Sequence, residues 1–290
     1  MAKNTDSNAP VNQLICFADA DTGIKLCQLS VKLISRTKAS TMTVLQLMTE
    51  EQAHLIGDIE KYKNNTFQST IELCKNREIT IRIFVKISDN FSDDVVNMVD
   101  EYGCNLLLVG IDKQAIDDNM VRQHSPFVND NENQLFFNRQ NATESIAIKS
   151  DLFDQLSSLI NRVTIMAGIF INNELRKIEN IFIPLLDIND TPLFRFVNSF
   201  ALKDIASVIT WDAVGIIENN PDLKKAYRDK FRSSDGRFRL WDTNEKISCD
   251  FIKQQDLIII GLESWNKLTS AALTWSHSLP STLIIKDKTN

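Results

Sequence analysis

The sequence predicts an α/β protein with two tandem units, each a parallel sheet of five strands covered by helices. Three observations lead to this prediction. Short apolar runs alternate with longer segments whose apolar residues recur at helical spacing, the central runs are apolar on both faces, and the order of elements occurs twice. Buried parallel strands joined by crossover helices produce this pattern. The length of 290 residues suits two domains of ordinary size.

The first unit, 14–175, is expected to hold five strands with a helix between each pair, after a flexible segment at 1–13. Each expected strand is a short apolar or β-branched run, and each expected helix has apolar residues three or four positions apart. The expected strands are 14–18, 42–47, 79–85, 106–109 and 165–171. The expected helices lie within 24–34, 50–75, 95–102 and 152–159.

The second unit, 176–290, repeats this order almost without a linker, and the sequence places the join within 172–179. Its clearest match to the first unit is DLIIIG at 256–261 against NLLLVG at 105–110. The expected strands are 181–185, 206–211, 237–241, 257–260 and 282–285. The expected helices lie within 193–200, 223–231, 247–251 and 265–279.

An insertion at 111–150 distinguishes the first unit from the second. It is rich in Asn and Asp, which suits a surface excursion without fixed structure. It also carries Phe127, Phe136 and Phe137, which are apolar enough to favour a contact surface. The second interpretation predicts that the insertion is a docking element.

Composition and motif content exclude several classes of protein. With 32 basic and 38 acidic side chains the net charge is -6, so no nucleic-acid partner is expected. There are 8 glycines, and the closest pair, Gly103 and Gly110, stand seven residues apart. Neither the G-x-G-x-x-G nor the G-x-x-x-x-G-K-[ST] phosphate loop can therefore occur. No apolar run reaches the ~18 residues of a membrane span, so we expect a cytoplasmic protein.

Side chains for metal binding or nucleophilic catalysis show no useful spacing. The five cysteines lack a C-x-x-C pair and are interpreted as buried reduced thiols. They are Cys16, Cys27, Cys74, Cys104 and Cys249. The three histidines have no Cys, Asp or His partner at ligand or triad spacing. We therefore expect no metal site and no enzymatic activity.

The residues LICFADADT at 14–22, together with the LLLVG and LIIIG strands, resemble the universal stress protein fold. This fold is an α/β flavodoxin-like unit, similar to the adenine nucleotide alpha hydrolases, that often occurs in tandem. A sharper resemblance is to the tandem tail of bacterial cation/proton (sodium/hydrogen) antiporters. The segments that carry it are MAGIFINNELRKIENIFIPLLDINDTPLFRFV, DLIIIGLESWNKL and SLPSTLIIKDK. It implies a regulatory module that works with an antiporter's membrane domain, as a homodimer.

The same resemblance assigns nucleotide-site positions, and the sequence departs from them. Universal stress proteins that bind ATP carry G-x-x-G-x(9)-G-[ST] after the fourth strand, where glycines let backbone N–H groups approach the phosphates. Only the first glycine of each motif remains, as Gly110 and Gly261. Non-glycine residues fill the later positions, which are Lys113, Gln123, Ser264 and Thr274. No cofactor is therefore expected, and an adenine nucleotide would bind weakly.

The carboxylates that follow the first strand of each unit are the remaining candidates. Asp19 and Asp21 follow the first strand, and Asp187 follows the corresponding strand of the second unit after Leu186. Asp19 and Asp21 could face a ligand at the strand ends, or they could cap the next helix. A phospho-accepting receiver domain would also use two carboxylates here. It needs an Asp at the end of the third strand, where Val85 to Ser88 supply none.

Three functions stay open at this stage. A non-catalytic regulatory module of an antiporter leads, a free-standing stress protein that binds an adenine nucleotide is the alternative, and an α/β hydrolase is the weakest. One basic cluster could serve a partner. It consists of Arg228, Lys230, Arg232, Arg237 and Arg239. The cluster could be a solvated face, a contact for an acidic partner, or a contact for anionic lipid.

Overall fold

The computed structural model describes residues 10–33, 40–113, 149–193, 206–241, 247–270 and 279–287. Their contacts form two compact units, one ending at Ile169 and the other running from Phe170 to Asp287. The sequence placed this boundary after Leu175. Most of the 111–150 insertion, with Phe127, Leu135, Phe136 and Phe137, lies outside the described residues, so the docking role remains a prediction.

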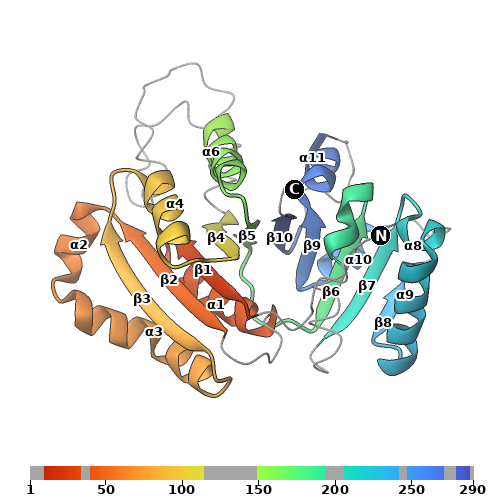
Figure 1. Ribbon diagram of the computed structural model, residues 1–290, viewed down its shortest axis with the longest axis horizontal. Coiled ribbons are helices and arrows are strands. Elements are labelled where there is room, and N and C mark those ends of the chain that lie inside the picture. The colour runs from red at the N-terminus through yellow and green to blue at the C-terminus, as the bar shows by residue number, and fades with distance from the viewer. Residues whose placement is uncertain are drawn as a thin grey trace. The chain divides into compact units, whose positions relative to one another are not determined.

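The first unit has the predicted alternation of strands and helices (Figure 1). Its strands are β1 (Asn12–Phe17), β2 (Thr41–Met48), β3 (Thr80–Ile87), β4 (Leu106–Asp112) and β5 (Met166–Asn172), in which the boundary between the units falls. Its helices are α1 (Ala20–Leu33), α2 (Glu50–Ile56), α3 (Ile59–Lys75), α4 (Phe91–Glu101) and α6 (Lys149–Arg162).

The prediction of one helix across 50–75 is wrong, because α2 and α3 are separate helices. Gly57 ends α2 with a φ of +70°, a left-handed conformation that glycine adopts without steric cost. Asp58 then starts α3, and its Oδ1 accepts the N–H of Lys61 at 2.9 Å. The apolar spacing runs on through this break, so periodicity alone did not reveal it.

The second unit has the same order with shorter helices. Its strands are β6 (Asn180–Leu185), β7 (Ser207–Asp212), β8 (Phe238–Leu240), β9 (Leu257–Gly261) and β10 (Ser281–Lys286). Its helices are the 3₁₀-helix η2 (Ile188–Leu193), α8 (Ile216–Asn219), α9 (Pro221–Ser233), α10 (Cys249–Lys253) and α11 (Leu262–Ser270). The predictions of helices within 193–200 and 265–279 fall partly outside the described residues.

The strand order is β3-β2-β1-β4-β5 in the first unit and β10-β9-β6-β7-β8 in the second. Every pairing with a defined register is parallel. Counted within each unit, the order is 3-2-1-4-5. Two separate five-stranded sheets are not confirmed, because the boundary between the units falls inside β5.

Helices pack onto the first unit in two groups. Helices α1 and α3 contact each other and the sheet, whereas α4 contacts α6 and β1 (Figure 1). Right-handed crossovers require this division, because the chain moves along the sheet in one direction from β1 to β3 and in the other from β3 to β4. Both β4 and β9 are buried along their apolar runs, as expected of central parallel strands.

Candidate functional site

Strand pairing brings two of the predicted site residues to one edge of the first unit. Phe17, the last residue of β1, is in register with Gly110 of β4, and Asp19 follows two positions later. The strand order reverses between β1 and β4, and open α/β sheets bind ligands outside the carboxyl ends of strands at such a point. Asp19 and Gly110 therefore share the edge at which a ligand would be expected.

The two carboxylates at this edge belong to the first turn of α1. Asp19 Oδ2 accepts the N–H of Thr22 at 2.9 Å, and the Asp19 carbonyl accepts the N–H of Gly23 at 3.0 Å. Asp21 is exposed in the same turn, where negative charge complements the partial positive charge of a helix N-terminus. Asp19 thus makes the contacts of a helix cap.

The glycines at this edge allow helix α1 to pack closely on the strands. A Cβ atom on Gly110 would lie 3.0 Å from Thr22 Cγ2 and 3.2 Å from Leu26 Cδ2. A Cβ atom on Gly23 would lie 2.2 Å from the Phe17 ring. Because Phe17 is fully buried, its ring and α1 together fill the space at the ends of β1 and β4. Gly110 here serves helix packing.

The corresponding edge of the second unit is organised around Asp190, in η2. Asp190 Oδ2 accepts the N–H of Leu186 at 2.8 Å and the N–H of Asp187 at 3.0 Å. It also accepts the Ser264 hydroxyl at 2.6 Å. Two backbone donors from the end of β6 and one side-chain donor from α11 therefore converge on one carboxylate oxygen.

Gly261 and Ser264, both predicted site residues, are placed directly against this carboxylate. A Cβ atom on Gly261 would lie 2.0 Å from Asp190 Oδ1, so only glycine fits at the end of β9. Ser264 has no exposed surface and Asp190 is 2% exposed. The predicted residues Asp187, Gly261 and Ser264 are thus brought together around Asp190.

Burial and hydrogen bonds shift the pKa values of the two carboxyls in opposite directions. Desolvation raises the pKa of Asp190 above its ordinary value, and the donors to its carboxylate offset only part of this effect. Lys267 Nζ donates to Asp187 Oδ2 at 2.6 Å, and this bond lowers the pKa of Asp187. The backbone N–H of Asn189 supports the same carboxylate at 2.9 Å.

This arrangement is an anion position filled by the protein's own carboxylate. Converging backbone N–H groups and a hydroxyl would suit a phosphate oxygen equally well. A phosphate would have to displace Asp190, and its charge would be repelled by any carboxylate that stayed nearby. Ser264 cannot act as a nucleophile from this position, because no substrate can reach its buried hydroxyl.

Asp190 and Lys267 were missed by sequence reasoning. The available signal was the spacing of Asp187 and Asp190, three positions apart at the end of a predicted strand. Their partners gave no such signal, because Ser264 lies 74 residues from Asp190 and Lys267 lies 80 residues from Asp187.

Other expectations concern metals, thiols and membrane spans. Among the described residues, no group of His, Cys, Asp and Glu side chains could hold a metal ion. Cys249 is half-buried, which corrects the interpretation of all five cysteines as buried. Burial raises the pKa of Cys74 and Cys104 to about 11, so neither is a thiolate at neutral pH. Within the same ranges, no helix has the length and hydropathy to cross a bilayer.

No family model and no curated protein matches the chain. Among solved structures, the cytoplasmic domain of a prokaryotic cation chloride cotransporter is similar, with a TM-score of 0.53 at 9% identity, over 97% of this chain and 96% of that one. A functionally unknown protein from Pseudomonas aeruginosa PAO1 has a TM-score of 0.46 at 13% identity, and the match covers 97% of this chain and 94% of that one. A candidate universal stress protein from Pseudomonas aeruginosa UCBPP-PA14 has a TM-score of 0.46 at 12% identity, and the match covers 96% of this chain and 94% of that one. Over 97% of its length, the chain shares its α/β fold with the cytoplasmic domain of a prokaryotic cation chloride cotransporter.

Proposed function

We propose that this chain is a cytoplasmic regulatory and interaction module of a membrane cation transporter, and that it is neither an enzyme nor a cofactor-binding protein. Within that class, a cation/proton antiporter is the transporter that the sequence motifs resemble. In this proposal each unit is a universal-stress-protein-like domain that has lost its nucleotide site. The observation that carries the proposal is the shared fold over 97% of the chain with a transporter's cytoplasmic domain.

The strand ends support a role without catalysis. In a nucleotide-binding α/β protein these ends hold the phosphates. Here Phe17 and α1 fill the edge of the first unit, and Asp190 fills that of the second. A domain closed in this way can still regulate a transporter, provided that its surface makes different contacts in different transport states. A homodimeric transporter would place two copies of the module side by side, which fits the predicted self-association.

Ion flux in membrane vesicles tests the proposed function. Everted vesicles are prepared from native cells that carry or lack the coding region of this chain, and cation-driven proton movement is followed over a range of pH and of Na⁺ and K⁺ concentrations. We expect loss of the chain to shift the half-maximal cation concentration by about 5-fold or more, the size of ordinary coupling between sites. Re-expression of the chain should restore it. Identical flux curves with and without the chain would contradict the proposal.

Calorimetric titration with ATP, ADP and AMP tests the alternative, a nucleotide-binding stress protein. We expect no binding tighter than ~10 μM, because that affinity requires a shaped phosphate cradle. A dissociation constant below this value would favour the stress-protein alternative. Asp190→Gly, which empties the anion position, is the matched variant, and it shows whether the carboxylate is what excludes the phosphates.

A further inference from the structure

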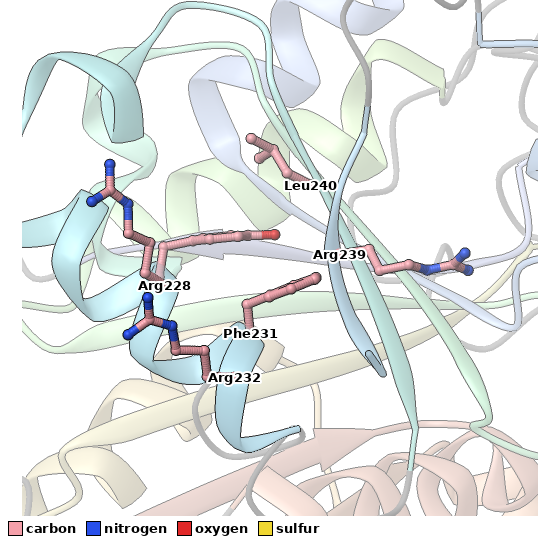
Figure 2. A pocket seen from close by; sticks show the side chains of 6 residues that line it. Arg228, Phe231, Arg232, Arg239 and Leu240 are labelled. Atoms are coloured by element: carbon pink, nitrogen blue, oxygen red, sulfur yellow. The ribbon is translucent and has the colours of Figure 1, made fainter. Parts of the chain in front are cut away.

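An open hollow of about 390 Å³ lies between α9 and β8 in the second unit (Figure 2). We refer to it as the α9–β8 hollow. Its lining residues are Tyr227, Arg228, Phe231, Arg232, Arg239 and Leu240. It is separate from the Asp190 site, with which it shares no residue.

The apolar surface of the hollow follows from the way α9 packs on the strand. The Tyr227 ring is buried against Phe238 of β8, with ring centroids 4.4 Å apart. Phe231 lies one helical turn after Tyr227, and Leu240 lies two positions after Phe238, on the same face of β8. Phe231 is 49% exposed and Leu240 is 44% exposed. Two large apolar side chains are therefore presented to solvent beside the hollow.

Two exposed arginines border this apolar surface. Arg228 and Arg232 stand one turn apart on α9, and Figure 2 shows both on the same side of the helix, next to Phe231. Neither forms an ion pair within the parts of the chain that the structure describes. Arg239 contributes little charge to the hollow, because its guanidinium points to the opposite side of β8 (Figure 2).

Two other cations near this surface already have partners. Arg237 Nε donates to the Ser234 carbonyl at 3.1 Å, and Lys224 pairs with Glu218 at 2.7 Å. The basic cluster of the sequence is therefore divided by the fold. Arg228 and Arg232 are exposed at the hollow, where an anionic partner can reach them.

We propose that the α9–β8 hollow docks an acidic peptide segment of a partner protein, with one aromatic or large aliphatic side chain in the hollow and flanking carboxylates on Arg228 and Arg232. Arginine binds carboxylates through two parallel hydrogen bonds, which gives such a contact both strength and direction. The volume is at the lower end of the ~300 to 1,000 Å³ range of small-ligand pockets, so it suits one inserted side chain. A chain of net charge -6 that concentrates unpaired arginines at one apolar surface has the charge complementarity for this partner.

A peptide suits this surface better than a membrane. A flat anionic bilayer would also meet Asp229, which is exposed between the two arginines on α9, and Asp222 at its start. It would leave the hollow unfilled, since lipid headgroups attract basic residues over a broad surface. A peptide can place its carboxylates on the arginines and direct its backbone away from the aspartates.

Fluorescence anisotropy with a labelled peptide tests the proposal on the full chain. The probe has one central Phe flanked by three Glu on each side, and a second probe has Ala in place of Phe. We expect the Phe probe to bind, and Arg228→Glu with Arg232→Glu to weaken binding about tenfold or more. Phe231→Ala should weaken the Phe probe and leave the Ala probe unaffected.

Two control variants make equivalent substitutions on exposed surfaces away from the α9–β8 hollow. Lys61→Glu with Lys75→Glu makes the same change in net charge on the exposed surface of α3, and Leu55→Ala removes an exposed apolar side chain from α2. Neither should change binding. Equal losses in the charge controls, equal binding of the two probes, or no binding of the Phe probe would each overturn the proposal. So would tight binding to phosphatidylserine vesicles that is abolished by the arginine variants and is not competed by the probe.

Discussion

The two units have the same strand order, yet they fill the space at the carboxyl ends of their central strands by different chemistry. In the first unit an aromatic ring and a closely packed helix fill it, and Gly23 and Gly110 make room for them. In the second unit a buried carboxylate fills it, held by three donors and accommodated by Gly261. A glycine at the end of a strand therefore does not by itself indicate a ligand. In both units the neighbouring side chain decides what the glycine accommodates.

The first way to test this comparison is to empty the edge of the first unit. Phe17→Ala should destabilise that unit by about 3 to 5 kcal/mol, because it removes a fully buried ring and leaves a cavity. Gly23→Ala should cost about 1 to 3 kcal/mol through the clash with the same ring. Urea unfolding measures both, and the double variant should cost less than the sum. Additive costs would show that Gly23 is not there to accommodate Phe17.

The second test places a methyl group against the carboxylate of the second unit. Gly261→Ala should cost about 2 to 3 kcal/mol, because it pushes Asp190 away from its donors and leaves buried groups unpaired. The backbone at Gly261 is outside the left-handed region, so the clash is the main source of the cost. The same change made in an Asp190→Gly background should be nearly neutral in urea unfolding. A full cost in that background would refute the assigned role of Gly261.

A third test sharpens the comparison, because an emptied carboxylate position should bind anions and an emptied ring position should not. Asp190→Gly leaves the N–H groups of Leu186 and Asp187 and the Ser264 hydroxyl without their acceptor. Formate at tenfold excess over its Kd should restore about 1.4 kcal/mol. For a unit of this size, that raises the Tm by about 5 to 6 °C. Sodium chloride at equal ionic strength is the control, and Phe17→Ala should not respond. No response of Asp190→Gly to formate would contradict the anion position.

The smallest expected effects concern pH. The pKa of Asp190 is raised above its ordinary 3.8, so its contribution to stability is fully present below that value and is lost as pH rises through the folded-state pKa. The pKa of Asp187 is lowered, so its contribution is present above 3.8 and is lost as pH falls. The free energy of unfolding is measured in urea from pH 3 to 7. Its difference from wild type should change with pH in opposite directions for Asp190→Asn and Asp187→Asn. Lys267→Gln should cost under about 1 kcal/mol and remove the Asp187 effect. If both variants differ from wild type with the same pH dependence, the environments of Asp190 and Asp187 do not differ as described.

The fold was predictable because each strand is specified by its own residues. The apolar runs of β4 and β9 and the helix-spaced residues of α1 and α9 are local signals, and each became the expected element. The boundary between the units inside β5 could not be predicted, since an apolar run specifies a strand and does not show which unit its contacts belong to. The break at Gly57 was a local signal that continued periodicity concealed.

The candidate site was less predictable because its contacts are long-range. Gly261 and Ser264 were found only through a motif that they no longer satisfy. The group that lies against both residues, the Asp190 carboxylate, comes from the other end of the unit. The sequence cannot distinguish a glycine that admits a ligand from one that admits a side chain of the same protein.

The central place of β1 in the strand order also constrains how the chain folds during synthesis. Strand β1 begins at Asn12, and its partner β4 arrives much later, since the Asn12 N–H pairs with Asn105 across 93 residues. At ~5 to 20 residues per second, a ribosome needs several seconds to complete that interval. For this time one side of an apolar strand has no native neighbour, and the nascent chain is open to aggregation or chaperone binding. Strand β6 meets the same delay, because its partner strand β9 follows Asp256, 76 residues after Asn180.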